Sequence, residues 1–341
     1  MINRIYRLTD KHTFEIFLKE IPFDENLVMV RPTYMSICRA DQRYYNFERP
    51  AEVLAKKIPM ALIHEAVGKV IFDPLRKFDV GQKVILIPTI PTEPDIVVEE
   101  NYLRSSLFCS SSCDGFMQEM VNHPSARLVP VSSDFDSEVI AYSELMSVAI
   151  HAIKRFDRKS HIKRNCFGIW GDGSLGFIVS LFVKAKYPNA KIIVFGKSNT
   201  KLQFFSFADE VRQIDDKNSI PNIDHAFECV GGYGCQNAIN QIIDLINPEG
   251  VISLLGVSEE AVSINTRMCL EKGLTLLGNS RSSKNDFEEV LNLLKERPNL
   301  MGYLKNLITQ KISVKNLHDI KTAFELDRIK PWGKTLIEWS I

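Results

Sequence analysis

The sequence predicts a two-domain α/β protein, in which a mostly β domain is joined to a domain built on a doubly wound parallel sheet. Three observations lead to this expectation. The chain of 341 residues exceeds the length at which a single hydrophobic core usually stops growing. Its first part consists of short β-branched runs separated by Pro, Gly and Asp. Its second part alternates apolar strands with helices.

The first domain is marked by short apolar or alternating runs, such as 27–31, 68–73 and 83–88. From 137 to 156 the apolar residues recur at helical spacing instead. We expect this helix to connect the two domains.

The second domain shows a repeated strand–helix rhythm. Strands are expected at 166–170, 191–195, 224–230, 251–255 and 274–278. Helices are expected at 175–187, 236–246 and 286–296. Because strands that alternate with helices form parallel sheets, this region predicts a doubly wound fold.

The last part of the chain contains a helix near 317–327 and a strand at 334–339. We expect this segment to return to the first domain. The predicted boundaries are therefore 1–143 and 300–341 for the first domain and 144–299 for the second.

Charge and composition exclude several classes of protein. Lys plus Arg and Asp plus Glu number 42 each, so no net field attracts nucleic acid or an anionic membrane. Residues 1–17 carry charges throughout, and no segment approaches the roughly 20 apolar residues of a membrane span. The seven cysteines are an odd number and are scattered, unlike a secreted disulfide framework. We expect a cytoplasmic protein with a small-molecule partner.

Three glycines stand between a predicted strand and a predicted helix in the order G-x-G-x-x-G. They are Gly171, Gly173 and Gly176 in the segment CFGIWGDGSLGF. The first glycine allows a tight turn, the second lets the backbone approach a pyrophosphate, and the third allows close helix packing. The amides at the helix N-terminus would hold the diphosphate. The segment predicts a dinucleotide site, with a purely structural glycine turn as the alternative.

The type of dinucleotide depends on the end of the next strand. A site that prefers NAD carries Asp or Glu about 20 residues further on, and this position is Gly196. The following loop offers two lysines and a serine that could surround a 2′-phosphate. We expect NADP(H), with solvated loop residues and loose specificity as the alternative. The predicted cofactor-binding residues are Gly171, Asp172, Gly173, Ser174, Leu175, Gly176, Lys197, Ser198, Lys201, Val230, Gly231 and Arg281.

Five residues of metal-binding type are scattered over the first domain and the start of the connecting helix: Cys38, Asp41, His64, Glu65 and Glu144. Their spacing alone is a weak signal, because single residues of these types are usually structural. They occur, however, in C-x-x-D, in IHEAVGKV and in SELMSVAIHA, all upstream of the glycine motif. This combination resembles the zinc-dependent medium-chain dehydrogenase superfamily over nearly the whole chain, and within it the polyol dehydrogenase branch.

The resemblance implies a GroES-like catalytic domain and a Rossmann domain. It also implies one catalytic zinc bound by Cys38, His64 and either Glu144 or Glu65, with a coordination position left for water or substrate oxygen. Asp41 would orient His64. The zinc would polarise the substrate carbonyl, and the nicotinamide would supply the hydride.

Two departures from the superfamily pattern affect these expectations. Many relatives carry Ser or Thr two residues after the cysteine to relay the substrate proton, and this chain has Ala40 there. Arg43 stands where some alcohol dehydrogenases have a relay histidine, so we expect a metal-bound water working with Glu65 instead. Of the four cysteines that often hold a structural zinc, only Cys109 and Cys113 remain, which predicts no structural zinc.

Longer motifs resemble the ribulose-5-phosphate reductases, which make ribitol 5-phosphate for precursors of teichoic acid or capsule. These motifs are RPTYMSICRADQRYY, ALIHEAVG, FGIWGDGSLG, HAFECVGG, GVSE followed by NTR, and the closing WGK. The resemblance implies NADPH-dependent reduction of D-ribulose 5-phosphate to D-ribitol 5-phosphate, which feeds CDP-ribitol synthesis. It also implies a dimer or a tetramer, of which we expect the homodimer, and a cytidylyltransferase partner that uses the product.

A sugar phosphate requires a cationic clamp near the metal, and Arg43, Tyr44 and Tyr45 follow the first metal ligand closely. Arg43 is the first candidate for the phosphate, with the two phenols beside it. A surface arginine next to packed tyrosines is the alternative. Arg281 and Lys334 are weaker candidates, because either would equally well touch the cofactor or face water.

Two other functions remain compatible with the sequence. One is a zinc dehydrogenase for an unphosphorylated polyol such as sorbitol, in which Arg43 has no phosphate to bind. The other is a noncatalytic NADP-binding subunit that senses redox state or scaffolds a partner enzyme. The intact set of metal-binding residues argues against the second of these.

Overall fold

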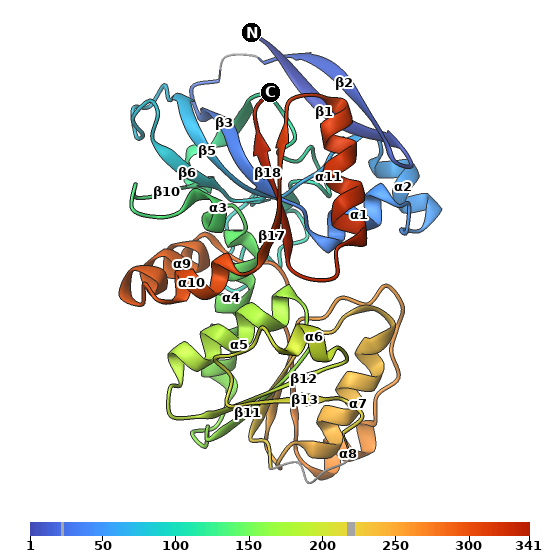
Figure 1. The fold of residues 1–341 in the computed structure, drawn as a ribbon. Coiled ribbons are helices and arrows are strands. Elements are labelled where there is room, and N and C mark those ends of the chain that lie inside the picture. The colour runs from blue at the N-terminus through green and yellow to red at the C-terminus, as the bar shows by residue number, and fades with distance from the viewer. Residues whose placement is uncertain (22–23, 217–221) are drawn as a thin grey trace. The chain divides into compact units, whose positions relative to one another are not determined.

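The structure, a computed structural model, describes residues 1–21, 24–216 and 222–341. The chain forms two compact units (Figure 1). Unit 1 comprises Met1–Ser147 and Ser282–Ile341, and unit 2 comprises Val148–Arg281.

Unit 1 is built mainly on antiparallel β-structure. Its strands are β1 (Ile2–Asp10), β2 (Thr13–Glu20), β3 (Leu27–Ser36), β4 (Met60–Ala61), β5 (Glu65–Phe72), β6 (Lys83–Leu86), β7 (Thr89–Ile90), β8 (Leu107–Phe108), β9 (Val121–Pro124), β10 (Leu128–Pro130), β17 (Ile308–Val314) and β18 (Lys334–Trp339). A seven-stranded sheet has the order β10-β6-β5-β3-β18-β17, with β9 paired to β3. A three-stranded sheet has the order β2-β1-β4, and β7 pairs with β8.

Short helices surround these sheets. They are α1 (Arg39–Tyr45), α2 (Ala51–Lys57), α3 (Ser137–Ile140), the start of α4 (Ser143–Lys159), α9 (Lys284–Glu296), α10 (Leu300–Lys305) and α11 (Leu317–Ile329), with a 3₁₀ turn at Ser125–Arg127. Helix α11 packs against β17 and β18 (Figure 1). The helix expected over 137–156 is interrupted, because the Tyr142 amide bonds to the carbonyl of Val139, three residues back. That tighter turn separates α3 from α4.

Residues 282–299, which the sequence analysis placed in the second domain, group with unit 1. The reason is the packing of α9 against β10. The Lys284 amide at the start of α9 also donates a hydrogen bond to Glu100 Oε1 at 2.9 Å. Helix periodicity identifies α9 correctly, but it carries no information on which core the helix joins.

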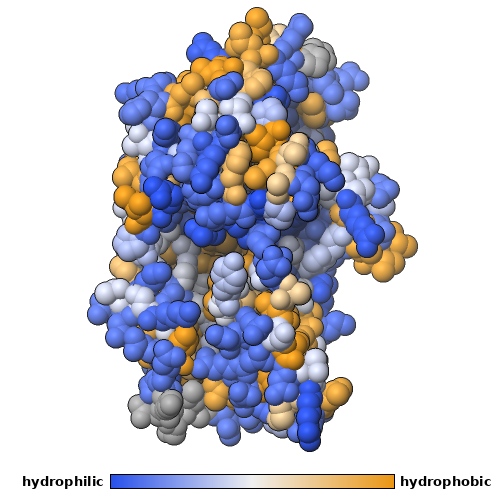
Figure 2. Space-filling model, turned by 90° about the vertical axis from the view of Figure 1, so that its right-hand side faces the viewer, coloured by the Kyte–Doolittle hydropathy of each residue, from blue (hydrophilic) through white to orange (hydrophobic). Residues whose placement is uncertain are grey.

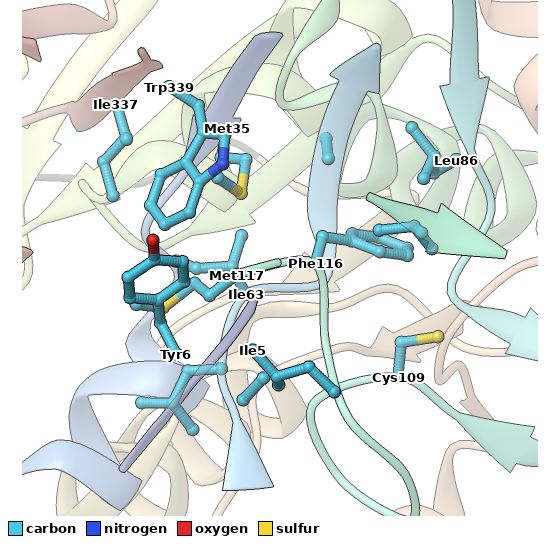
Figure 3. Close-up of a cluster of buried hydrophobic side chains, with 14 of the residues drawn as sticks. Ile5, Tyr6, Met35, Ile63, Leu86, Cys109, Phe116, Met117, Ile337 and Trp339 are labelled. Carbon is cyan, nitrogen blue, oxygen red and sulfur yellow. The ribbon is translucent and has the colours of Figure 1, made fainter. Parts of the chain in front are cut away.

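The last strand completes the core of unit 1. Strand β18 runs antiparallel to β3, with Ile337 opposite Met35. The Trp339 ring stands edge-on to Tyr6, with 5.3 Å between centroids, and its Nε1 donates to the carbonyl of Gln118 at 3.0 Å. Figure 3 shows the side chains of Trp339, Ile337, Met35 and Tyr6 together in this cluster. Residues from both ends of the chain therefore close one hydrophobic core.

Unit 2 contains the doubly wound sheet that the sequence predicts. Its strands are β11 (Cys166–Trp170), β12 (Lys191–Gly196), β13 (Glu210–Gln213), β14 (His225–Glu228), β15 (Val251–Leu254) and β16 (Thr275–Gly278). Its helices are the rest of α4, α5 (Ser174–Lys186), α6 (Asn199–Leu202), α7 (Cys235–Leu245) and α8 (Thr266–Glu271), with a 3₁₀ turn at Gly232–Gly234. All six strands are parallel, in the order β13-β12-β11-β14-β15-β16. The strand order reverses beside β11, which is where ligands bind in such sheets.

None of the helices in the described segments combines the length and the apolar character that a membrane crossing requires. On the face drawn in Figure 2, hydrophilic residues predominate and hydrophobic ones occur in small groups. Exposed hydrophobic side chains such as Ile162, Leu270 and Ile329 come from distant parts of the chain. Single exposed side chains of this kind are ordinary for a globular protein, whereas Ile96, Val97 and Val98 form a consecutive exposed run.

A substitution at Gly115 would test how closely the backbone of unit 1 is packed. A Cβ atom at this position would overlap the carbonyl oxygens of Leu62 and Ile63. We expect Gly115→Ala to lower the free energy of unfolding by about 1–3 kcal/mol, because two backbone segments must move apart. The matched control is Gly302→Ala in α10, where an added Cβ meets no atom within 4 Å and should raise stability by roughly 0.5–1 kcal/mol. Denaturant unfolding measures both, and equal effects would contradict the packing described.

Candidate active site

Three side chains form the group of metal-ligand type in the described part of the chain: Cys38, His64 and Glu65. Each offers one ligand atom, and the three atoms lie within 4.8 Å of one another. Cys38 is the N-cap of α1, just after β3, and Glu65 begins β5. Ser36 of β3 lies directly opposite Glu65 in the sheet. The pairing of these two strands therefore brings the three ligands together.

Asp41 holds the chain segments that carry these ligands. Its Oδ2 accepts a hydrogen bond from the Cys38 amide at 3.0 Å. Its Oδ1 accepts from the Ile63 amide at 3.0 Å and from Ser110 Oγ at 2.8 Å. Burial alone would raise the pKa of this fully buried carboxyl, but His64 and the hydrogen bonds lower it below its ordinary value. Asp41 is therefore an ionised anchor for three segments.

His64 lies in an environment that attracts positive charge. Its Nδ1 is 3.5 Å from Asp41 Oδ1, too far for a well-formed hydrogen bond. Burial alone would lower the pKa of His64, but Asp41 and Cys38 outweigh it and raise that pKa well above its ordinary value. A bound cation would supply the positive charge that these groups favour.

Glu65 is paired with a lysine from the far end of the sequence. Its Oε1 accepts a hydrogen bond from Lys334 Nζ at 2.8 Å, and both side chains are buried. Burial opposes the charge of Lys334, yet Glu65 and Cys38 raise its pKa above the usual value. This pairing gives Lys334 an anionic partner of its own, which weakens its earlier candidacy for a substrate phosphate.

Glu144 lies in the first turn of α4 and is buried close to the same group. Burial raises its pKa to about 7, and the charge of Glu65 acts in the same direction while His64 opposes it. Glu144 is not among the three ligand atoms within 4.8 Å of one another. In this geometry Glu65, rather than Glu144, completes the set with Cys38 and His64.

These residues fit a zinc ion. Thiolate, imidazole and carboxylate are the ligand types of catalytic zinc sites. Glu65 Oε2 is buried and has no hydrogen-bond partner in the segments that the structure describes. A buried carboxylate oxygen without a partner is unfavourable, and coordination to a cation would satisfy it.

The loop after β8 packs behind this group. The ring of Phe108 lies 5.3 Å from that of His64, and Ser110 donates to Asp41. A hydrogen bond between Cys109 and Cys113, together with burial, raises the pKa of Cys109, and the same bond lowers the pKa of Cys113. Both cysteines are free thiols. The loop therefore supports the site through Phe108 and Ser110.

The three residues predicted for a substrate phosphate separate in the structure. Tyr45 is fully buried, its ring packs 4.9 Å from Phe324, and its hydroxyl donates to Glu325 at 2.8 Å. This position removes Tyr45 from the candidate site. Tyr44 faces another way, and its hydroxyl accepts a hydrogen bond from Lys57 Nζ at 3.2 Å. Arg43 lies half-buried in the last turn of α1.

In unit 2, the glycine motif turns the chain from β11 into α5. Gly171 has a φ of +130°, and a Cβ there would lie 2.9 Å from the carbonyl oxygen of Cys229. A Cβ on Gly176 would overlap the Gly171 carbonyl oxygen. At Gly173, by contrast, a Cβ would meet no atom within 4 Å, so the start of α5 is open. This loop has the form that a pyrophosphate requires.

Asp172 connects this turn to the end of β12. Its Oδ2 accepts hydrogen bonds from the amides of Lys197 and Ser198, both at 2.8 Å. A Cβ on Gly196 would lie 2.6 Å from the Asp172 Cβ. Position 196 therefore has no room for the acidic side chain of an NAD-preferring site unless Asp172 moves. Ser198 in turn caps α6 through the Lys201 amide at 3.4 Å.

The turn after β14 is organised by Glu228, which the sequence analysis did not single out. Its carboxylate accepts hydrogen bonds from the amides of Val230 at 2.8 Å, Gly231 at 3.3 Å and Gly256 at 3.0 Å. Gly231 has a φ of +66°. The two turns that follow β14 and β15 are therefore held together at the same end of the sheet.

The remaining predicted cofactor residues lie at element ends. Ser174 and Leu175 begin α5, so their amides belong to its open first turn. Arg281 is the last residue of unit 2 and has a φ of +59°.

Comparison with known proteins identifies the relatives of this chain. Residues 24–133 match the model of the alcohol dehydrogenase GroES-like domain, and residues 184–296 match that of zinc-binding dehydrogenase. The chain is 49% identical to the ribulose-5-phosphate reductase of Bacillus spizizenii over 100% of both sequences. It is 50% identical to ribulose-5-phosphate reductase 1 of Staphylococcus aureus over 99% of both. The chain belongs to the ribulose-5-phosphate reductase family.

Solved structures agree with this membership. Staphylococcus aureus TarJ in complex with NADPH superposes with a TM-score of 0.89 at 44% identity, covering 100% of both chains. The L-idonate 5-dehydrogenase of Escherichia coli superposes with a TM-score of 0.86, and at 21% identity it shows only the shared fold. The predicted fold class, a GroES-like domain with a Rossmann domain, is confirmed.

In this member of the ribulose-5-phosphate reductase family, several residues support the site without a strong signal in the sequence. Ser110 is an ordinary polar residue whose contact with Asp41 depends on distant segments. Lys334 stands in the closing WGK motif, and Glu228 in HAFECVGG, so motif position could have drawn attention to both.

Metal content tests the proposed ligand group directly. We expect the purified protein to hold one zinc per chain and Cys38→Ser to lose most of it, because the hydroxyl is a far poorer ligand than a thiolate. Cys269→Ser is the matched control, since Cys269 lies in unit 2 outside the group. Elemental analysis after dialysis against a weak chelator measures both. Full zinc retention in Cys38→Ser would contradict the assignment.

The glycine motif allows a second test. Gly173→Ala should leave the melting temperature nearly unchanged and weaken NADPH binding by roughly tenfold or more, because the methyl group occupies the space left for the pyrophosphate. Gly176→Ala should instead lower the melting temperature, because its methyl group overlaps the Gly171 carbonyl. Fluorescence titration with NADPH and thermal unfolding distinguish the two. Unchanged NADPH affinity in a folded Gly173→Ala would place the cofactor elsewhere.

Proposed function

We propose that this protein reduces D-ribulose 5-phosphate to D-ribitol 5-phosphate, with NADPH as hydride donor and one bound zinc. The observation that carries the proposal is the Cys38–His64–Glu65 group, with Cys38 partly exposed, in a chain 49–50% identical to ribulose-5-phosphate reductases over their whole length. Unit 1 would then be the catalytic part, and unit 2 the dinucleotide-binding part.

Cys38, His64 and Glu65 would hold the zinc, with the buried Glu144 as the alternative to Glu65. When bound, the zinc would polarise the substrate carbonyl as a Lewis acid, while NADPH supplies the hydride. Asp41 would fix the positions of Cys38 and His64 by accepting hydrogen bonds from the Cys38 amide and from the Ile63 amide next to His64. Lys334 would hold Glu65 Oε1 and leave Oε2 without a partner among the described residues.

Reduction of a ketone also requires a proton at the substrate oxygen. Ala40 offers no hydroxyl for this purpose, so the proton must come from another group. We propose that a water molecule working with the Glu65 carboxylate supplies it. This water would replace the side-chain relay of other alcohol dehydrogenases.

Unit 2 would bind NADPH at the end of β11. The open first turn of α5, beginning after Gly173, would hold the pyrophosphate. Lys197, Ser198 and Lys201 would surround the 2′-phosphate, because Gly196 leaves no acid to repel it. Asp172 would position this loop through the Lys197 and Ser198 amides. Val230, Gly231 and Arg281 would line the same cofactor site.

The proposal extends to the setting of the reaction. The product would serve a cytidylyltransferase that makes CDP-ribitol for teichoic acid or capsule synthesis. Seven free cysteines suit the reducing cytoplasm, where NADPH is available. We also propose that the protein acts as a homodimer.

Steady-state kinetics with a panel of substrates tests the function. We expect kcat/KM for D-ribulose 5-phosphate with NADPH to exceed that for D-ribulose by at least about 100-fold, because a bound phosphate contributes several charge-assisted hydrogen bonds. NADH should be the poorer donor. Sorbitol oxidation with NADP⁺ should be slow.

The control is His64→Ala, which should lower kcat by orders of magnitude while NADPH affinity is retained, because His64 lies in unit 1. Equal activity of this variant would reveal a contaminating enzyme. A preference for an unphosphorylated sugar would overturn the sugar-phosphate proposal in favour of a polyol dehydrogenase. A protein that reduces nothing and holds no zinc would indicate a noncatalytic NADP-binding subunit.

A further inference from the structure

Lys57 donates hydrogen bonds to two neutral oxygens in unit 1. It is the last residue of α2 and is half-buried. Its Nζ donates hydrogen bonds to the Tyr44 hydroxyl at 3.2 Å and to Ser111 Oγ at 3.0 Å. It also lies 5.8 Å from the centre of the Tyr44 ring. We call Lys57, Tyr44 and Ser111 the Lys57 triad.

The charge of Lys57 is not balanced by a carboxylate. In the residues covered by the structure, its contacts are the phenol, the hydroxyl and the aromatic face just described. The two lysines near Cys38 differ, because Lys330 pairs with Asp327 and Lys334 pairs with Glu65. A half-buried ammonium surrounded by neutral groups favours an anion from outside the chain.

The hydrogen bonds of the triad leave only donors unused, on the buried Tyr44 and on the half-buried Lys57 and Ser111. An ammonium group can donate but cannot accept, so Tyr44 and Ser111 must both accept from Lys57. Each hydroxyl therefore keeps its own hydrogen, and neither has an acceptor in the segments described. The ammonium retains a third N–H. Three donors without an acceptor suit a tetrahedral oxyanion such as phosphate.

The triad is close to the proposed catalytic group along two paths. Tyr44 lies one turn after Asp41 on α1, so the two share a face of that helix. Ser111 follows Ser110, whose Oγ donates to Asp41 at 2.8 Å. Both paths meet at Asp41, which contacts the Cys38 amide. A substrate with its carbonyl at the metal group could place a group several atoms away at the triad.

We propose that the Lys57 triad binds the phosphate of the substrate. The inference rests on the proposed function, and it deepens it by assigning the group that selects a phosphorylated sugar. A phosphate monoester carries about −1.5 to −2 charges near neutral pH and three acceptor oxygens, which match the three donors. The guanidinium of Arg49, 5.0 Å from the Tyr44 ring, adds positive potential. Of the residues first expected to bind phosphate, only Tyr44 belongs to this triad.

Lys57→Met is the main test, because it keeps the length of the side chain and removes the charge. We expect its KM for D-ribulose 5-phosphate to rise roughly 10- to 100-fold, with kcat within about threefold. The slow rate with D-ribulose should not change, because that sugar has no phosphate. Lys56→Met is the matched control, since Lys56 is its exposed neighbour on α2 and should behave as wild type. Tyr44→Phe and Ser111→Ala should each raise KM by roughly 3- to 10-fold.

Inorganic phosphate is a direct probe that does not depend on turnover. With saturating NADP⁺ present to fill unit 2, calorimetric titration should show one phosphate site in wild type and a weaker or absent one in Lys57→Met. An unchanged KM for D-ribulose 5-phosphate in Lys57→Met would overturn the proposal. A loss of kcat with both sugars alike would also overturn it, because it indicates a structural role.

The two proposals fail differently. If wild type prefers unphosphorylated sugars, the proposed function fails, and the phosphate titration still decides whether the triad binds an oxyanion. If wild type reduces D-ribulose 5-phosphate well and Lys57→Met does too, only the triad assignment fails.

Discussion

The metal-ligand group of this protein depends on one buried carboxylate, that of Asp41. Its oxygens accept hydrogen bonds from the Cys38 amide, the Ile63 amide and the Ser110 hydroxyl. An ionised group in an apolar interior is unfavourable unless such partners surround it. These partners come from three separate segments, so the carboxylate is satisfied only when all three are in place. Formation of the fold and formation of the metal-ligand group are therefore coupled.

Three lysines of unit 1 differ in whether a carboxylate balances their charge. Lys334 and Lys330 are paired with Glu65 and Asp327, so each contributes to a buried arrangement that is nearly neutral. Lys57 has only neutral oxygens and a ring as contacts in the described structure. The paired lysines position acidic groups, and the third is suited to an anion that arrives with the substrate. Proximity to the site alone would not distinguish them.

In unit 2 the shape of the dinucleotide site depends on the room that the glycines leave around the backbone. Gly173 leaves the start of α5 open, whereas Gly176 lets that helix pack on the turn. Asp172 accepts hydrogen bonds from the loop after β12 and also fills the space beside Gly196. The absence of an acid at position 196 is thus part of the packing of this turn. A side chain there would have to displace Asp172.

The sequence by itself determined the two-domain rhythm of strands and helices and the glycine turn, because periodicity and short motifs are local properties. The residues of the metal-ligand group were indicated by the family resemblance. Strands such as β11 and β18 begin and end where the sequence predicts. Only the tertiary structure decided which partners adjacent side chains contact. Tyr44 accepts a hydrogen bond from Lys57, whereas Tyr45 donates one to Glu325. It also decided that Lys57 meets Ser111, which lies 54 positions away, and that α9 joins unit 1. Contacts of this kind arise from the packing of distant segments, for which a single sequence carries no local signal.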